Sequence, residues 1–216
     1  MTAPAVDAQD KSEMTGNQNW LVTADGNRQS FGSVEVDEPE RIYRMYRFLT
    51  DLEDILDATP DDRGRLEAIT PRVRQLLISS YWLQMEFHQP PVDPGWSVNF
   101  LYREHEWPLT VQMVAWLPGN PSPIHNHAAW AVVAIIGGQE KNTIWRRVPD
   151  PEHPDRIEKV AEMILNPGDI ITFMPDAIHS VEPLGDEPTI SFNLYGKTTF
   201  KDRYEFDPET HTANNF

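Results

Sequence analysis

The chain has 216 residues, a formal net charge of −16 at pH 7 and no cysteine. An acidic balance argues against binding to nucleic acid, whose phosphates attract Lys and Arg, and against anionic membrane surfaces. Disulfides and thiolate metal ligands are excluded because cysteine is absent. Residues 1–19 are polar and lack the apolar segment of a secretory signal, and no apolar run approaches the roughly 20 residues of a membrane span. We therefore expect a single cytoplasmic domain, a monomer or a homodimer, with neither nucleic acid nor membrane as a partner.

The first 88 residues divide into two parts. Residues 1–37 are expected to form a flexible polar arm, because their few large apolar residues are isolated. Residues 38–88 carry apolar side chains at helical spacing and are predicted to form the helical N-terminal part of the domain. We expect helices over 39–56, over 61–69, and over 70–84 with Thr70 as N-cap and Pro71 in the first turn. The third helix should bury a stripe made of Val73, Leu76, Leu77, Ser80 and Tyr81.

After a Pro- and Gly-rich break at residues 89–95, the apolar pattern changes from helical to strand-like. Residues 89–200 are predicted to form a mainly β barrel, because short apolar runs alternate with turns that carry Gly, Pro or Asp. The predicted strands are 97–103, 109–117, 129–136, 142–148, 157–166, 169–173, 179–183 and 188–195. Residues 201–216 are polar and are expected to form a C-terminal tail that either folds back on the domain or is loose.

The segment Pro123–Trp130 holds two histidines, His125 and His127, between two apolar runs. Side chains two apart on a strand point to the same face, so this pair supplies half of a metal site. The best candidate for the other half is His179, on a strand opened by a Pro-Gly-Asp turn. Three neutral imidazoles would leave a divalent ion its full charge and an open position, which favours an anionic ligand such as a thiolate or hydroxide. Ligand softness alone does not separate iron from zinc, nickel or copper.

The glycines and prolines around these histidines resemble the two signature motifs of the cupin superfamily. Gly119 lies six residues before the first histidine, the pair Gly137-Gly138 closes the next strand, and Pro175 precedes the third histidine by four. The resemblance implies a cupin-type β-barrel (double-stranded β-helix) with the N-terminal α-helices packed on it. Standard cupins add a Glu four or five residues after the second histidine, where this chain has Ala131 and Val132.

A closer resemblance is to the thiol dioxygenases, which are cysteine dioxygenase and 3-mercaptopropionate dioxygenase. The run Trp116–Ala131 resembles their iron-binding segment, and Thr189–Gly196 resembles their Ser-x-His-x-Tyr strand; together with the helices, the likeness covers roughly residues 40–200. It implies iron(II) on His125, His127 and His179, and oxidation of a small thiol, 3-mercaptopropionate- or cysteine-like, to its sulfinate with O2. The alternatives are a cupin metalloenzyme acting on a non-thiol substrate and a non-catalytic cupin that binds a metal or ligand.

The chain departs from the thiol dioxygenase pattern at two asparagines. Asn126 stands where the family usually has Asp between the first two ligands, and Asn193 replaces the His of the Ser-x-His-x-Tyr strand. Ser191, Asn193 and Tyr195, the candidate catalytic residues that the resemblance implies, should share one strand face. On that face an Asn can orient Tyr195 by a hydrogen bond, but it cannot carry a proton as imidazole can.

The strand that should anchor the substrate reads Asn99-Phe-Leu-Tyr-Arg-Glu-His105. Cysteine dioxygenases place a Tyr and an Arg two apart on such a strand, where the Arg pairs with the substrate carboxylate. Strand alternation leaves two sets that can face the metal: Leu101, Arg103 and His105, or Phe100, Tyr102 and Glu104. The first set supplies a carboxylate clamp and the second suits an amine. We favour Arg103, and the remaining candidate substrate-binding residues are Tyr102 and Trp130.

Overall fold

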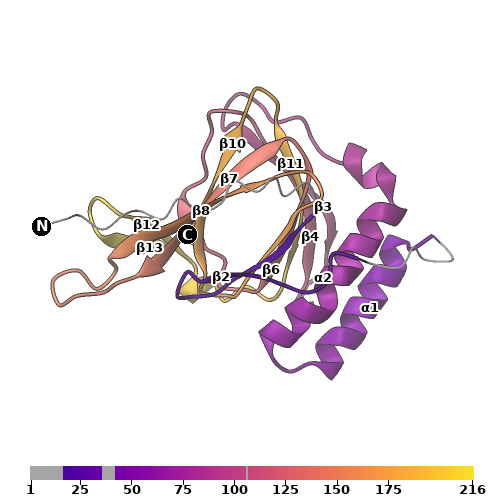
Figure 1. Cartoon of the computed structure of the whole chain (residues 1–216), viewed down its shortest axis with the longest axis horizontal. Coiled ribbons are helices and arrows are strands. Elements are labelled where there is room, and N and C mark those ends of the chain that lie inside the picture. The colour runs from indigo at the N-terminus through magenta and orange to yellow at the C-terminus, as the bar shows by residue number, and fades with distance from the viewer. Residues whose placement is uncertain (1–16, 36–41, 106) are drawn as a thin grey trace, which may run out of the picture.

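The computed structural model of the chain describes residues 17–35, 42–105 and 107–216. Within these ranges the chain forms two β-sheets that face each other as a barrel, and two α-helices against the outside of one sheet (Figure 1). The mainly β architecture with N-terminal helices packed on it, which the sequence predicts, is confirmed. None of the helices in these ranges is long and apolar enough to cross a membrane.

The larger sheet has, among the described residues, seven strands in the order β2-β1-β9-β6-β11-β4-β3. They are β1 (Asn19–Val22), β2 (Arg28–Ser30), β3 (Trp96–Arg103), β4 (Thr110–Trp116), β6 (Ala131–Gly137), β9 (Ile170–Phe173) and β11 (Thr189–Tyr195). The smaller sheet has, in the same ranges, six strands in the order β13-β12-β5-β10-β7-β8. They are β5 (Ile124–Asn126), β7 (Gln139–Arg147), β8 (Ile157–Leu165), β10 (Ile178–Leu184), β12 (Tyr204–Asp207) and β13 (Thr212–Asn215).

The strands from β4 to β11 pair in a nested pattern. β4 pairs with β11, β5 with β10, β6 with β9 and β7 with β8, and every pair is antiparallel. The run β4–β7 therefore pairs antiparallel, in reverse order, with the run β8–β11, and the two runs wind around the barrel together. This is the double-stranded β-helix, the jelly-roll arrangement found in cupins, so the fold expected from the sequence is confirmed by the pairing itself.

The strands predicted between residues 97 and 195 are all present, with ends that differ by up to three residues. The prediction missed β5, which has only three residues and follows Pro123. A strand that short cannot show the alternation on which strand prediction depends.

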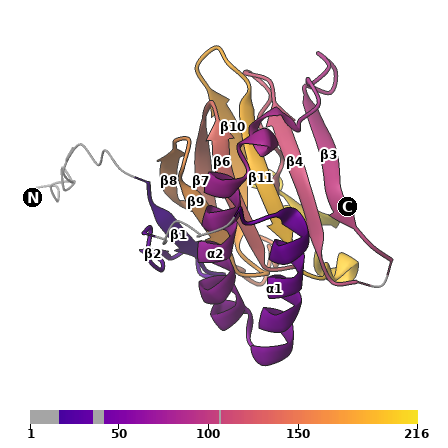
Figure 2. The same ribbon diagram turned by 90° about the vertical axis from the view of Figure 1, so that its right-hand side faces the viewer.

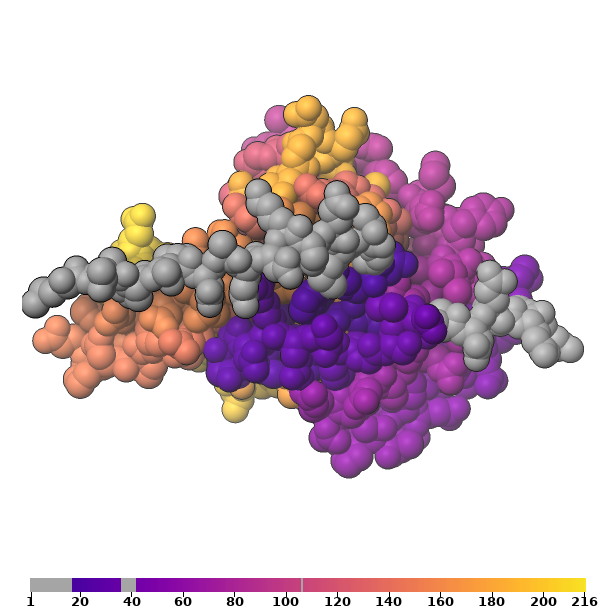
Figure 3. All heavy atoms as spheres, in the orientation of Figure 1, coloured from indigo at the N-terminus to yellow at the C-terminus, as the bar shows by residue number. Residues whose placement is uncertain are grey.

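The expected flexible arm over residues 1–37 is wrong for its described part, 17–35, which forms a hairpin of β1 and β2. β1 adds to the edge of the larger sheet in parallel with β9, and its Leu21 and Val22 are fully buried. Figure 3 shows the hairpin in indigo along one face of the molecule. Its partner lies about 150 residues away in the sequence, so no local pattern indicates it. Residues 1–16 and 36–37 lie outside the described ranges.

The expected C-terminal tail over residues 201–216 is also structured. β12 and β13 form an antiparallel hairpin, and β12 pairs with β5 so that Glu205 lies opposite His125. Phe206 is buried on the outer side of this sheet with Ile178, while the polar residues around it face solvent. The hairpin therefore extends the smaller sheet beside the histidine pair.

The helical region contains α1 (Met45–Ala58), α2 (Asp62–Ser79) and a short 3-10 helix, η1 (Tyr81–Met85). The helix expected over 39–56 corresponds to α1, and positions 39–41 lie outside the described residues. The second and third expected helices are one, because α2 continues through Pro71. Thr70 is not an N-cap; its hydroxyl donates to the Leu66 carbonyl at 2.7 Å. Asp61 caps α2 instead, since its carboxylate accepts from the Gly64 N–H at 2.9 Å.

Helix α2 tolerates its internal proline because its apolar face is packed against the larger sheet (Figure 2). Of the stripe predicted for this helix, Val73, Leu76 and Ser80 are buried and Leu77 is half-buried. Tyr81 is 80% exposed, because α2 ends at Ser79 and the chain changes direction there. The stripe prediction is therefore wrong at its last residue.

Besides the small cluster around Phe206, two larger apolar cores result from this layering. The helix-side core lies between α1, α2 and the outer face of the larger sheet, and includes Val111 and Met113 of β4 and Trp130. The interior core fills the barrel and includes Val133 and Phe173, with Tyr195 packed against it. Membership of one core or the other shows which way a strand residue points, because successive side chains alternate faces.

Candidate metal centre

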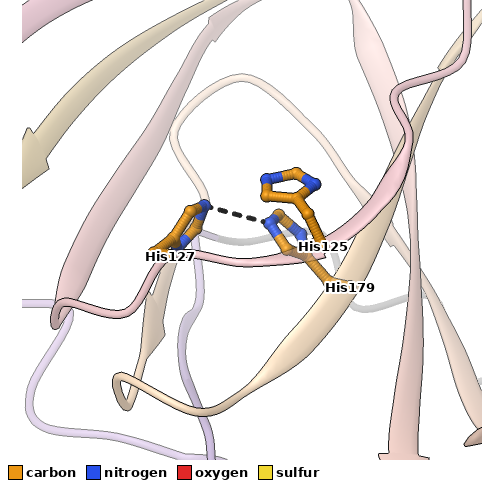
Figure 4. A group of neighbouring side chains, drawn as sticks. All are labelled: His125, His127 and His179. Atoms are coloured by element: carbon orange, nitrogen blue, oxygen red, sulfur yellow. Dashed lines mark hydrogen bonds between the residues drawn. The ribbon is translucent and has the colours of Figure 1, made fainter. Parts of the chain in front are cut away.

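The three histidines predicted as metal ligands lie together at one end of the barrel interior (Figure 4). His125 is on β5, His127 follows that strand, and His179 is on β10 directly opposite His125. One ring nitrogen from each lies within 4.8 Å of the others. Because His125 and His179 are paired across neighbouring strands, their rings lie on the same face of the sheet. The third ring belongs to His127, two residues after His125. This group of side chains could hold a metal ion.

Two of the three rings are oriented by carbonyl groups. The His125 Nδ1 lies 2.9 Å from the Pro123 carbonyl oxygen, and the His179 Nδ1 lies 2.9 Å from the Asn142 side-chain oxygen. A carbonyl oxygen only accepts, so each Nδ1 carries the proton and donates it. The Nε2 lone pairs of both rings are therefore left for a metal, which is how metal-binding histidines are usually fixed. Asn142 is held in turn, because its amide donates to Glu140 Oε1 at 2.9 Å.

The spacing of one pair of Nε2 atoms fits a bound metal ion. His179 Nε2 lies 3.2 Å from His127 Nε2 (Figure 4). Two imidazole nitrogens each about 2.1 Å from one ion and about 100° apart around it are separated by about 3.2 Å. The His127 Nδ1 is buried without a hydrogen-bond partner among the described residues. Three imidazoles are also a donor set that suits zinc, iron, copper and nickel.

Burial keeps these rings neutral. The pKa of His125 is lowered to about 4, mainly by burial and also by the nearby positive charge of Arg203, against the raising effect of the Pro123 carbonyl. Burial, followed by the neighbouring histidines, also lowers the pKa values of His127 and His179 well below the usual value. Ligand histidines must be deprotonated, so the site is ready for a cation at neutral pH.

Tyr195 lies beside the histidines, with its ring centroid 5.1 Å from that of His127. Its hydroxyl donates to Asn193 Oδ1 at 3.0 Å, and Asn193 Nδ2 donates to Ser191 Oγ at 2.9 Å. The three candidate catalytic residues therefore share one face of β11 and form one hydrogen-bonded row. Burial raises the pKa of the Tyr195 phenol, so it is neutral at pH 7.

The anchor strand β3 carries a β-bulge between Phe100 and Tyr102, which breaks the alternation assumed from the sequence. Tyr102 lies opposite Val111 of the helix-side core, so it points away from the histidines. Its hydroxyl donates to Glu104 at 2.5 Å. Neither of the two predicted sets shares a face as a whole, because the bulge moves Tyr102 out of step with Phe100.

Arg103 lies opposite Thr110, which in turn lies opposite Tyr195, so all three share the interior side of the larger sheet. Its guanidinium is exposed, however, and lies over the Phe100 ring at 5.4 Å from the ring centroid. Trp130 is 4% exposed and belongs to the helix-side core rather than to the interior. Of the predicted substrate-binding residues, only Arg103 therefore points to the side of the metal centre.

Sequence reasoning missed two charged groups at the centre, Arg203 and Glu140. Arg203 lies between η2 (Phe200–Asp202) and β12, and its charge acts on His125 and Tyr195. Its Nε is buried without a partner among the described residues, and its guanidinium stacks at 4.2 Å on the Phe216 ring centroid. Nothing in the polar C-terminal sequence distinguishes this arginine from a solvated one.

Glu140 lies on β7 and is only 3% exposed. Burial raises the pKa of its carboxyl to about 7, against the lowering effect of the hydrogen bond from Asn142. It is linked to the metal centre through Asn142 and His179. In the sequence it stands between the Gly137-Gly138 pair and an alternating strand, where a Glu is more commonly solvated.

No protein-family model matches the chain. Among solved structures, it is similar to the cupin domain of Cnp3 from Schizosaccharomyces pombe, with 11% identity over 54% of this chain and 71% of that chain and a TM-score of 0.39. A protein with a double-stranded β-helix domain from Klebsiella pneumoniae shares 16% identity over 54% of this chain and 83% of that chain, with a TM-score of 0.42.

The DMSP lyase DddQ from Ruegeria pomeroyi shares 16% identity over 59% of this chain, with a TM-score of 0.40. The match spans 63% of the lyase, which is less than two thirds of its length. The fold assignment made above rests on the strand pairings of this chain and not on these scores.

Proposed function

We propose that this protein is a mononuclear non-haem iron(II) thiol dioxygenase that oxidises a small thiol, 3-mercaptopropionate- or cysteine-like, to its sulfinate with O2. The proposal is carried by one observation, the group of three neutral histidines, of which His127 and His179 are buried and His125 is half-buried, and which includes no carboxylate. A divalent ion on such a set keeps its full positive charge, which favours a thiolate as the incoming ligand. The likeness of residues 116–131 and 189–196 to the thiol dioxygenases supports the choice of iron and O2.

The Nε2 atoms of His125 and His179 would hold the metal together with His127, the third ligand of the group. Iron(II) bound there would supply a redox-active centre at which a thiolate and O2 can meet. Both oxygen atoms of O2 end on the sulfur, so a thiol and O2 give the sulfinic acid with no outside reductant. The ring of Phe173, 4.2 Å from that of His179, walls the site with apolar surface and keeps water out.

Tyr195 would orient the reacting atoms. Its neutral hydroxyl has one proton, which it donates to Asn193 and can turn toward a bound ligand beside His127. Because the Asn193 amide neither takes up nor releases a proton, the role of this row is to hold the hydroxyl in place rather than to move protons. Arg203 supplies the positive charge near the histidines, which suits a substrate with a carboxylate.

The test is to load the protein with iron(II) without air and then follow O2 consumption with cysteine, 3-mercaptopropionate, cysteamine and 3-mercaptolactate. We expect one O2 consumed per sulfinate formed, with a carboxylate-bearing thiol as the best substrate. Zinc-loaded protein is the matched control, because it offers the same ligands without redox chemistry and should consume no O2. Iron-loaded protein that consumes no O2 with any thiol would refute the proposal.

A second candidate is a cupin metalloenzyme that acts on a non-thiol substrate. It is favoured by Asn193, which cannot carry the proton that the family's His can. Turnover of a non-thiol carboxylic acid by the iron-loaded protein, with no turnover of any thiol, would select this candidate. Thiol binding to the metal without any O2 consumption would instead indicate a binding protein.

A further inference from the structure

Asn126, between the first two histidines, uses both ends of its amide. It is 4% exposed. Its Nδ2 donates to the Asp202 carbonyl at 2.9 Å, and its Oδ1 accepts from the Tyr204 N–H at 2.7 Å. The two contacts lie on either side of Arg203. An Asp at this position would place a second acceptor against the Asp202 carbonyl, so only an amide satisfies both groups.

Residues 201–204, here called the strap, are also tied from β13. Asn215 donates through Nδ2 to the carbonyls of Lys201 and Arg203, at 3.0 and 2.9 Å. Backbone groups on both sides of Arg203 are therefore fixed. The Phe216 ring, which follows Asn215, stacks on the guanidinium and lies edge-on to the His125 ring at 6.0 Å between centroids.

The direction of the Arg203 side chain follows from the alternation of β12. Tyr204 and Phe206 pack together on the outer side of the smaller sheet, with Ile124 of β5. Their neighbours Arg203 and Glu205 must therefore point to the opposite side, where His125 points. Glu205 is exposed and its charge is solvated, whereas the Arg203 Nε is buried and without a partner among the residues described. None of the ion pairs within the described ranges involves Arg203.

We infer that Asn126 is a positioning residue: it holds the strap so that Arg203 faces the metal centre, and the site thereby selects thiols that carry an anionic group. The inference rests on the proposed function for the thiol end of the ligand. The planar guanidinium, held against Phe216, presents its donors as a fork that fits a carboxylate. It also gives a reason for the asparagine at position 126, where the thiol dioxygenases usually have Asp.

The inference is tested by binding to zinc-loaded protein, in which no O2 chemistry takes place. Calorimetry gives the dissociation constants of 3-mercaptopropionate and of 1-propanethiol, and their ratio isolates the carboxylate. We expect wild type to prefer the carboxylate by about 10- to 100-fold, as charge-assisted hydrogen bonds allow. The preference should disappear in Arg203→Gln and fall at least fivefold in Asn126→Asp, with an unchanged zinc content. Asn166→Asp, the same charge change at an exposed site, is the matched control and should keep the preference.

A double-mutant cycle separates positioning from general damage. If Asn126 acts through Arg203, Asn126→Asp should cause no further loss of preference in the Arg203→Gln protein. An equal loss in both backgrounds, or a full preference in Asn126→Asp alone, would overturn the inference.

A second measurement does not depend on the metal or on thiols. Propionate added to metal-free protein should shift the NMR signal of the Arg203 Nε–H, and a higher concentration should be needed in Asn126→Asp. If no thiol binds the zinc-loaded protein, the proposed function fails, but this titration still decides the role of Asn126. An Arg203 signal that does not respond to propionate in wild type would refute the inference.

Discussion

The buried carboxyl of Glu140 should make the stability of the metal-free protein fall as the pH rises through neutrality. Burial raises its pKa from 4.5 to about 7, so between these values the folded protein keeps a proton that the unfolded chain releases. The free energy of unfolding therefore decreases with rising pH across this window. A pKa difference of about 2.5 units corresponds to about 3 kcal/mol, most of it lost between pH 5 and pH 8.

Glu140→Gln isolates this effect. Glutamine has nearly the same shape, its Oε1 can still accept from Asn142, and it does not ionise. The metal-ligand histidines change stability in the opposite direction, because their lowered pKa values make the folded state more stable as the pH rises toward 6.5. That contribution is common to both proteins and cancels in their difference.

Urea unfolding followed by tryptophan fluorescence measures the difference at pH 5, 6, 7 and 8. We expect the stability of Glu140→Gln relative to wild type to increase by about 2–3 kcal/mol between pH 5 and pH 8. A difference that is constant with pH would show that Glu140 ionises in the folded protein as it does in water. In that case water would have to reach the hydrogen-bonded chain that runs from Glu140 through Asn142 to His179.

Four further predictions test the metal centre and the fold. His179→Ala should reduce the metal content measured by mass spectrometry from about one ion per chain to near zero, and full metal content in this variant would refute the ligand assignment. Asn142→Ala should weaken metal binding about 10- to 100-fold, because the His179 ring loses its orienting acceptor. Leu21→Ala should lower the free energy of unfolding by about 2–5 kcal/mol in urea titrations, because this β1 side chain is fully buried; a change below about 0.5 kcal/mol would mean that the β1–β2 hairpin does not belong to the cooperative fold. Asn193→His should give the turnover number a pH dependence that wild type lacks, because an imidazole can exchange a proton with Tyr195, and it should lie below about pH 6.5 because burial disfavours the charged imidazole. Identical pH profiles would show that the row from Tyr195 to Ser191 carries no proton in either protein.

Local patterns in the sequence were sufficient for the barrel strands between residues 97 and 195, apart from the three-residue β5, and for the histidine group. The barrel strands combine alternating apolar residues with Gly and Pro turns, and both signals lie within about ten residues of sequence. His125 and His127 are placed by the same alternation, and His179 by the turn before its strand. The nested pairing then brings His179 opposite His125, which a cupin-like motif pair already implies.

The features that were missed depend on contacts between distant parts of the chain. The β1 strand is held by β9, about 150 residues later, and β12 is held by β5, about 80 residues earlier. The segments that contain β1 and β12 are mostly polar, so no local sequence pattern indicates either pairing. The bulge in β3 adds one residue without changing composition, so simple alternation wrongly placed Tyr102 on the same face as Phe100, although Tyr102 and Arg103 do point to opposite faces as expected. Arg203 was missed because its position depends on the hairpin that was itself missed.

Three buried asparagines surround the histidines, and together they explain why this site differs from one built with ionisable neighbours. Asn126, Asn142 and Asn193 are each at most 4% exposed, and each uses both its donor and its acceptor. Asn126 holds the strap, Asn142 joins His179 to Glu140, and Asn193 joins Tyr195 to Ser191. An amide orients its partners as an Asp or His would, but it never changes charge. The contacts that these amides make therefore add no charge of their own to the histidine group, and a metal ion bound there would keep the positive charge on which thiolate binding depends. Among the groups that touch these amides, Glu140 is the acid whose pKa is raised to near neutrality. Asn142 lies between Glu140 and the metal ligands and hydrogen-bonds to the Glu140 carboxylate.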